Sequence, residues 1–354
     1  MTGVTRAALA ALLLAACDGA AAARETPPAA QVVRRPPPGD TLKFAEAVRR
    51  GAELPRLTGM LVAQDGRVVA EEYWRGGAAT RRTNIKSASK SVLSALVGIA
   101  AGEGKLRVDQ PVAEILPEHF GPGTDPRKRA ITVGHLVSMT AGLESTSFDN
   151  YGEWVQSRDW VRDALRRPLE AAPGERMIYS TGSTHLLSAV LTRATGSSTW
   201  AYAVEKLGEP LGITIPRWQR DPQGIYFGGN DMYLTPRAML AFGELYRNGG
   251  VHQGRQIVPR EWVSESMKPR GASDYSGFDY GYGWWLRQSG RHEIYFAWGY
   301  GGQHIFVAPS LGLTAVFTSI SEGPRERGHL PAIHAIVDEQ LVPAAEAARE
   351  WRGR

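Results

Sequence analysis

The most informative part of the chain is the stretch Ser87-Ala88-Ser89-Lys90-Ser91-Val92-Leu93-Ser94-Ala95-Leu96-Val97. Apolar residues at 92, 93, 96, 97 and 100 follow helical spacing, so we predict a helix that begins at Ser87 and ends near Gly102 or Gly104. In this helix the Ser87 hydroxyl and the Lys90 amine lie one turn apart on the same face. Such a pair is typical of enzymes that activate a serine nucleophile with a lysine instead of a histidine. The plainer alternative is a solvated helix cap beside a surface amine, because Ser-x-x-Lys fixes only two positions.

The first forty residues predict export and attachment to a membrane. Arg6 is followed by an apolar run over 7–16, which is typical of a secretory signal and too short to span a bilayer. Residues 14–17 read Leu-Ala-Ala-Cys, so we expect 1–17 to be a bacterial lipoprotein signal peptide with Cys17 lipidated. The alternative is an ordinary signal peptide that is cut within 20–23. We therefore expect an exported protein on the periplasmic side of a bacterial membrane, held there by a lipid anchor and without disulfides.

Composition indicates a tether followed by one large domain. Residues 18–40 are rich in alanine and proline, which suits a semi-rigid tether, and 41–345 contain no second linker and no repeat. The formal net charge is +5, and basic residues are scattered among acidic ones, which argues against a nucleic-acid partner. The sequence has no His-Glu-x-x-His, cysteine cluster or phosphate-loop spacing, so we expect no metal and no cofactor. It also lacks the Gly-x-Ser-x-Gly of an α/β-hydrolase.

The order of predicted elements indicates a sheet built from both ends of the chain. Apolar runs over 57–63 and 67–74, joined by Gln64-Asp65-Gly66, predict a hairpin. Helical spacing follows over 132–140, 154–167, 181–195, 199–207 and 236–248. Strands are predicted again over 283–287, 293–298, 304–308 and 313–318, before a final helix over 329–341. Ser87 would then lie where this sheet meets an inserted helical lobe, which is where clefts form.

Four further segments carry a resemblance to a known family. They are 105–112 followed by Leu116-Pro117-Glu118, 131–143, Pro173-Gly174-Glu175 leading to Tyr179-Ser180, and 228–237. With Ser87 and Lys90 they cover nearly all of 55–345 in order and spacing. The chain resembles the serine β-lactamase and penicillin-binding superfamily, in its class C-like branch of esterases, carboxypeptidases and 6-aminohexanoate oligomer hydrolases. The resemblance implies an α+β, β-lactamase/transpeptidase-like fold, with an antiparallel sheet flanked by helices and an inserted helical lobe.

The resemblance also implies a role for each matching residue. Ser87 would be the acylated nucleophile, Lys90 the amine that takes its proton, and Tyr179 the phenol that shuttles protons to the leaving group. Lys90 can act as a base only when it is neutral, which burial in a cleft favours. The backbone N–H groups of Ser87 and Tyr300, the second on an edge strand, would form the oxyanion hole. The alternative for Tyr179 is a core tyrosine whose hydroxyl is satisfied.

Substrate contacts are expected around the glycines that follow this strand. Gly301 and Gly302 would let a substrate backbone approach closely. Trp284 is expected to bind substrate, and Trp285, Trp298 and Trp154 could also wall an apolar acyl pocket. The alternative is that each of these tryptophans lies in the core.

Two departures from the family pattern bear on the substrate. The second motif reads Tyr179-Ser180-Thr181 and lacks the asparagine found two places after the tyrosine in β-lactamases. The third motif reads Gly299-Tyr300-Gly301 and lacks the basic residue that would receive a substrate carboxylate, for which Arg287 or Arg291 are candidate substitutes. We therefore predict a serine hydrolase that forms an acyl-enzyme on Ser87 and acts on a small-molecule ester or linear amide. The alternatives are a β-lactamase or D-alanyl carboxypeptidase, and a non-catalytic sensor domain of the same fold.

Overall fold

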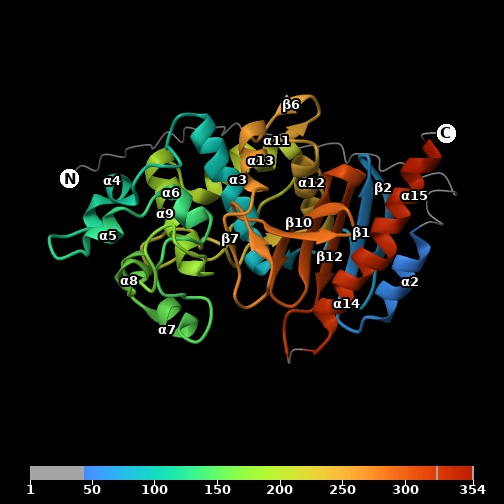
Figure 1. Cartoon of the computed structure of the whole chain (residues 1–354), viewed down its shortest axis with the longest axis horizontal. Coiled ribbons are helices and arrows are strands. Elements are labelled where there is room, and N and C mark those ends of the chain that lie inside the picture. Colours follow the sequence, from blue (N-terminus) through green and yellow to red (C-terminus); the bar gives the residue numbers. More distant parts are fainter. Residues whose placement is uncertain (1–43, 324–325, 353–354) are drawn as a thin grey trace, which may run out of the picture. The chain divides into compact units, whose positions relative to one another are not determined.

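An antiparallel sheet of eight strands organises the computed structural model, which describes residues 44–323 and 326–352 (Figure 1). The predicted signal peptide, Cys17 and the tether lie outside the described residues. The strands are β1 (Leu57–Gln64), β2 (Arg67–Tyr73), β7 (Gly271–Ala272), β8 (Asp279–Tyr280), β9 (Trp285–Ser289), β10 (His292–Gly299), β11 (Gln303–Ala308) and β12 (Leu313–Ser319). Their order is β2-β1-β12-β11-β10-β9-β8-β7, and β1 pairs with β12 with Leu61 opposite Val316. The prediction of one sheet built from both ends of the chain is confirmed.

The hairpin of β1 and β2 turns at the predicted place. Asp65 and Gly66 both have positive φ, 49° and 80°. Two such residues make the tight turn whose twist matches that of the flanking strands, and an Asp-Gly pair adopts it at low cost.

Helices cover both faces of the sheet because successive strand residues point to opposite sides. Leu61, Ile305 and Val316 belong to one apolar cluster together with residues of α12 (Pro236–Arg247). Met60, Val62 and Phe317 belong to a second apolar cluster on the other face. The helices that cover this second face are α2 (Ala45–Glu53), α14 (His329–Ile336) and α15 (Val342–Arg352), the last two joined by a π-helical turn over Val337–Leu341. The final helical segment therefore runs past the predicted end at residue 341.

The middle of the chain forms the inserted helical lobe, most of which lies on the left of Figure 1 in teal to green, while its last helix, α11, lies near the top centre. Its helices are α4 (Val112–Ile115), α5 (Pro126–Arg129), α6 (Val133–Val137), α7 (Tyr151–Gln156), α8 (Trp160–Arg166), α9 (Thr181–Thr195), α10 (Thr199–Ala203) and α11 (Glu209–Leu211). The single helix predicted over 154–167 is wrong. The chain breaks at Ser157, and Asp159 caps α8 by accepting a hydrogen bond from the backbone N–H of Arg162.

The remaining elements are short. They are β3 (Thr83–Asn84) paired with β4 (Tyr233–Leu234), β5 (Val251–His252) paired with β6 (Arg255–Gln256), α13 (Arg260–Ser266), and 3-10 turns over Lys86–Ala88, Pro117–His119 and Pro309–Leu311. Among the described residues, no helix combines the length and the apolar character needed to cross a bilayer.

Helix α3 (Ser89–Gly102) lies between the lobe and the sheet and is buried on all sides over residues 89–100. It was predicted to bury one apolar stripe, but its polar face is also covered. The hydroxyl of Ser91 donates to the carbonyl of Gly283 at 2.5 Å, and that of Ser94 donates to the carbonyl of Tyr282 at 2.6 Å. Buried hydroxyls that are hydrogen-bonded in this way cost little, so the helix can occupy the centre of the fold.

Candidate active site

Ser87 lies in the 3-10 turn Lys86–Ala88, just before the first residue of α3, and not in the α-helix itself. The preceding residue, Lys86, has a φ of 53°, which a side chain with a Cβ rarely adopts. Asn84 holds this conformation, since its Oδ1 accepts from the backbone N–H of Lys86 at 2.9 Å. Its Nδ2 in turn donates to Oδ1 of Asp231 at 2.7 Å. The backbone that presents Ser87 is thus fixed by side chains from two distant segments.

The Lys90 amine is placed next to the Ser87 hydroxyl. Lys90 is only 2% exposed, and its Nζ lies 3.1 Å from Ser87 Oγ. The same amine donates to the Gly229 carbonyl at 2.7 Å and lies 3.2 Å from Thr181 Oγ1. All three partners are neutral oxygens, so no carboxylate offsets the cost of burying the charge. Burial lowers the pKa of Lys90 to about 7, which leaves a large neutral fraction at physiological pH.

Tyr179 completes the predicted trio and is held by aromatic packing. Lys90 Nζ lies 5.0 Å from the centroid of its ring, which stacks on Trp285 at 5.5 Å and 28°. Tyr280 packs edge-on against the same ring at 6.3 Å. Burial raises the pKa of the Tyr179 phenol, and its hydrogen bond with Ser87 opposes this shift only in part. The phenol is therefore protonated at neutral pH and can donate a proton to a leaving group.

Two residues that were not predicted also fix the Lys90 amine. Thr181 occupies the place of the missing asparagine, and its hydroxyl lies 2.8 Å from Ser147 Oγ, which accepts from the Thr181 N–H at 2.7 Å. Gly229 has a φ of 84°, and a Cβ there would lie 2.3 Å from Thr184 Oγ1. Only glycine fits this close approach, which brings the Gly229 carbonyl to the amine. The sequence carried a signal for both, namely the position two places after Tyr179 and the matching segment 228–237.

The predicted oxyanion donor Tyr300 lies in the tight turn between β10 and β11 and lines the pocket at Ser87. β10 is an inner strand of the sheet, so the expectation of an edge strand is corrected. However, β9 pairs with it only over His292–Phe296, and residues 297–299 extend beyond that ladder. A Cβ at Gly299 would lie 2.1 Å from the carbonyl oxygen of Ile85, so this end of β10 abuts the segment that leads to Ser87. The oxyanion hole of Ser87 and Tyr300 N–H groups stays a prediction.

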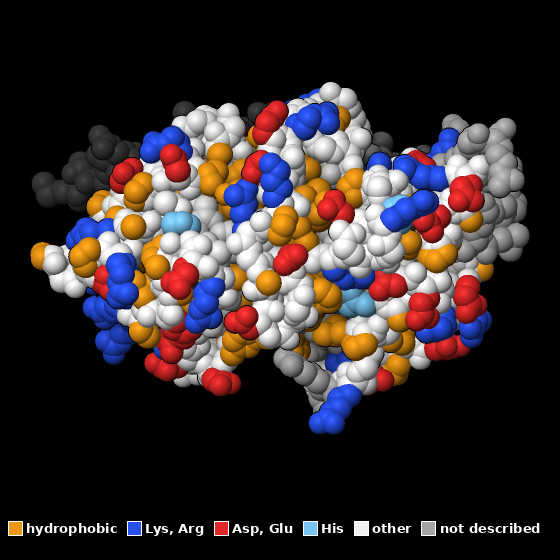
Figure 2. Space-filling model, viewed as in Figure 1, with side chains coloured by type: hydrophobic (Ala, Val, Ile, Leu, Met, Phe, Trp, Pro, Cys, Tyr) orange, Lys and Arg blue, Asp and Glu red, His pale blue; other side chains and the backbone are white. Residues whose placement is uncertain are grey.

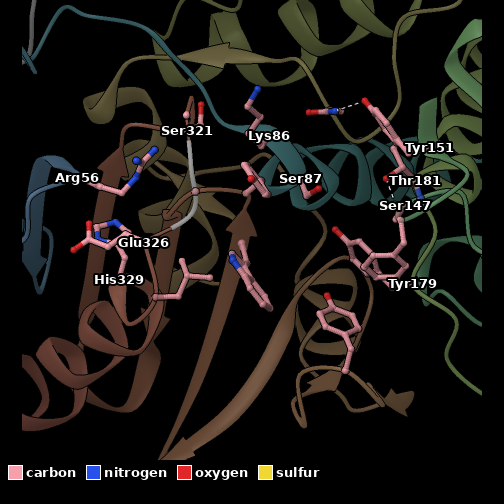
Figure 3. A pocket seen from close by; sticks show the side chains of 18 residues that line it. Arg56, Lys86, Ser87, Ser147, Tyr151, Tyr179, Thr181, Ser321, Glu326 and His329 are labelled. Carbon is pink, nitrogen blue, oxygen red and sulfur yellow. Dashed lines mark hydrogen bonds between the residues drawn. The ribbon is translucent and has the colours of Figure 1, made fainter.

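A pocket of about 710 Å³ opens at Ser87 (Figure 3). Its walls include Tyr179, Thr181, Gly301 and Trp298. In Figure 3, Arg56, Glu326 and His329 lie to one side of Ser87, and Tyr151, Ser147 and Tyr179 lie to the other. The charged residues on the face shown in Figure 2 are mixed in sign, with no extended patch of either charge.

The expectation that Trp284 and Gly302 contact substrate is corrected. Trp284 is fully buried in the core, where its ring stacks on Phe242 at 5.9 Å and meets Tyr246 at 4.6 Å. Gly302 is buried behind the turn, where a Cβ would lie 2.7 Å from Ser319 Oγ. Trp154 is also a core residue, which agrees with the alternative that the tryptophans lie in the core.

The two arginines considered as carboxylate receptors are engaged elsewhere. Arg287 donates to Asp338 at 2.7 Å, and Arg291 lies 3.2 Å from Glu346. Among the described residues, the lysine and arginine side chains that line the pocket are instead Lys86 and Arg56. Within 44–323 and 326–352, no three His, Cys, Asp or Glu side chains converge on a site that could hold a metal ion.

Comparisons with known proteins identify the family and the fold of the chain. The chain is 25% identical to the 6-aminohexanoate-dimer hydrolase of Paenarthrobacter ureafaciens over 275 residues, which is 70% of this chain and 69% of that one. It is 31% identical to esterase EstB of Burkholderia gladioli over 143 residues, 36% of each chain. A penicillin-binding protein homologue from Caulobacter crescentus has the same fold, with a TM-score of 0.69 at 18% identity over 87% of this chain and 98% of that one.

The predicted β-lactamase/transpeptidase-like fold is therefore confirmed. The sequence model of the β-lactamase family matches residues 44–338, a range that includes the sheet, the lobe and the pocket. The protein belongs to the β-lactamase family, and the sequence relatives named above are a 6-aminohexanoate-dimer hydrolase and an esterase.

Proposed function

We propose that the protein is a serine hydrolase that forms an acyl-enzyme on Ser87 and hydrolyses an ester or a linear amide. The observation that carries this proposal is the buried Lys90 amine, 3.1 Å from Ser87 Oγ and with a pKa lowered to about 7. A base with a pKa near the working pH combines a large neutral fraction with useful proton affinity.

The reaction follows from the positions of three side chains. Neutral Lys90 takes the Ser87 proton as Oγ attacks the carbonyl carbon. The oxygen of the tetrahedral intermediate accepts hydrogen bonds from the N–H groups of Ser87 and Tyr300. The Tyr179 phenol gives its proton to the departing alcohol or amine and is reprotonated at the expense of the Lys90 ammonium. Water then attacks the acyl-serine by the reverse path, which releases the acid and restores the Ser87 hydroxyl.

Two observations support an ester or linear amide as the substrate. The position that carries a lysine or histidine in the related β-lactamases is occupied by Gly299, and Arg287 and Arg291 are paired outside the pocket. The two sequence relatives compared above are named 6-aminohexanoate-dimer hydrolase and esterase EstB, and a dimer of 6-aminohexanoate is two amino acids joined by a linear amide.

The test is an assay of the purified protein with p-nitrophenyl acetate, a linear amide and nitrocefin. We expect ester or amide turnover that is lost in Ser87→Ala, together with fluorophosphonate labelling that is lost in the same variant. Ser264→Ala, which alters an exposed serine of α13, is the matched control. Nitrocefin turning over much faster than the ester would establish the β-lactamase alternative. If the protein shows no turnover of any of the three substrates and no labelling, the non-catalytic alternative is established instead.

A further inference from the structure

Large exposed hydrophobic side chains gather at the pocket. Among the described residues they are Phe148 (54% exposed), Tyr275 (50%), Tyr300 (42%) and Tyr233 (40%), and the first three line the pocket at Ser87. Single exposed apolar side chains are normal on a protein surface, but a cluster around one cavity indicates that something apolar binds there.

Phe148 and Tyr275 come from different parts of the fold and touch each other at one end of the pocket. Phe148 lies in the loop before α7 of the lobe, and Tyr275 lies in the loop between β7 and β8 of the sheet. Their rings touch edge-on, with centroids 5.5 Å apart and planes at 73°. We call these two residues the aromatic pair. The pair bridges lobe and sheet at one end of the pocket.

The aromatic pair also contacts the ring of Tyr179. The centroids of Phe148 and Tyr275 lie 6.5 Å and 6.0 Å from that of Tyr179. Tyr275 further packs against Trp298, another residue of the pocket wall, at 6.2 Å. A substrate group bound next to the Tyr179 phenol would therefore also contact the rings of the aromatic pair.

The other end of the pocket is polar. It is lined by Arg56, Ser321, Glu326 and His329, which lie together on the far side of Ser87 in Figure 3. An apolar group that entered this end would remove charged and hydroxyl-bearing side chains from water without replacing their hydrogen bonds. The two ends of one pocket thus favour opposite kinds of substituent.

We propose that the aromatic pair is a specificity site that binds an apolar, preferably aromatic, group of the substrate. This inference rests on the proposed hydrolase function and adds the substrate class to it. Half-exposed rings gain by burial against such a group, and aromatic rings prefer the edge-to-face geometry that the pair already shows. The apolar group belongs to the acyl part or to the alcohol part of the ester, and the experiment distinguishes the two.

The test compares three esters that differ only in the presence and position of a phenyl group. Ethyl acetate is the reference, ethyl phenylacetate carries phenyl on the acyl side, and its isomer 2-phenylethyl acetate carries phenyl on the alcohol side. We expect kcat/KM for one aryl ester to exceed kcat/KM for ethyl acetate. The ratio of these two kcat/KM values should fall about tenfold or more in the double variant Phe148→Ala/Tyr275→Ala. Acid release in a pH-stat measures all three. The aryl ester whose ratio falls identifies the side.

Two control variants separate the rings from other effects. Tyr275→Phe keeps the ring and removes the hydroxyl, so the ratio should be preserved. Tyr233→Ala removes an exposed aromatic ring that does not line the pocket, so it should also leave the ratio unchanged. Ratios for both aryl esters that are unchanged in the double variant overturn the proposal. So does an equal loss of the ratio in Tyr233→Ala.

A binding measurement distinguishes failure of this inference from failure of the hydrolase function. The two aryl esters are titrated into Ser87→Ala, with tryptophan fluorescence as the readout because Trp298 lines the pocket. We expect the dissociation constant of the preferred aryl ester to rise about tenfold when Phe148→Ala/Tyr275→Ala is added. If the unmodified protein cleaves neither esters nor the linear amide but this rise is seen, the hydrolase function fails and the specificity site stands. Equal affinity in both backgrounds overturns the specificity site, whatever the turnover.

Discussion

The two sides of the pocket differ in how their residues are held. Lys90 is fixed by hydrogen bonds to the distant Gly229 carbonyl and Thr181 hydroxyl, and the backbone before Ser87 is fixed by the nearby Asn84 side chain. Phe148 and Tyr275 are half exposed on loops and are held by ring contacts. The first side is built for one geometry. The second is built to be covered by a partner molecule, so changes there should alter preference rather than chemistry.

The largest expected effect comes from removing the amine on the fixed side. Lys90→Met keeps a similar volume but leaves Ser87 without a base, so kcat/KM for p-nitrophenyl acetate should fall about a thousandfold or more. Lys86→Met changes the other lysine at the pocket and should cost less than about tenfold. In the unmodified enzyme, kcat/KM should rise with pH along a limb centred near 7, because the lowered pKa of Lys90 sets its neutral fraction. Equal losses in the two lysine variants would contradict the role of Lys90 as the base.

Stability should show the cost of burying the same amine. The pKa of Lys90 is lowered from 10.5 to about 7 in the folded state, so between these values the unfolded chain binds more protons than the folded one. Stability of the native protein relative to Lys90→Met should therefore rise with pH, by about 2 kcal/mol from pH 7 to pH 9. Urea unfolding of both proteins at the two pH values measures the difference. A flat difference would mean that the amine is not desolvated.

The next effect tests whether the backbone before Ser87 needs its support. Asn84→Ala removes the acceptor of the Lys86 N–H and the link to Asp231, so kcat should fall about tenfold to a hundredfold while KM changes little. Lys86→Gly permits the positive φ of 53° without a side chain. The double variant should therefore regain part of the loss. Stopped-flow acylation rates measure this recovery, and its absence would assign Asn84 a different role.

The smallest effect concerns the residue that replaces the missing asparagine. Thr181→Val removes a hydroxyl that lies 3.2 Å from the Lys90 amine, so the ammonium form loses a partner and its pKa should fall further. The acid limb of kcat/KM should move to lower pH, with the plateau reduced about threefold to tenfold. Thr181→Ser retains the hydroxyl and should keep the native profile. A limb that moves to higher pH in Thr181→Val would contradict this role.

Much of the fold could be predicted because local signals agree with the final structure. Asp65-Gly66 marks its turn through backbone chemistry alone, and the helix over Thr181–Thr195 has the predicted bounds. The break before Asp159 was missed, because helical apolar spacing continues across α7 and α8 and conceals the cap. Residues 83–86 were predicted to be extended, but the pairing of β3 with β4 was missed, since two-residue pairings carry no periodicity.

The site was predictable where a motif fixes it and not where packing decides it. Ser87, Lys90 and Tyr179 do come together, as the family resemblance implied. Trp284 and Trp285 are neighbours in sequence, yet one joins the apolar cluster under α12 and the other lies beneath Tyr179. Neighbouring residues on an extended chain point to opposite faces, so composition could not say which tryptophan reaches the site.

The pairing of β1 with β12 has a consequence for when the protein becomes active. β1 ends at Gln64, and its neighbour in the sheet does not begin until Leu313. A growing polypeptide therefore carries its nucleophile long before it can complete the scaffold around it, and contacts so distant in sequence close late and slowly. Under the proposed mechanism, Ser87 therefore cannot act until the chain through Ser319 is available to complete the sheet.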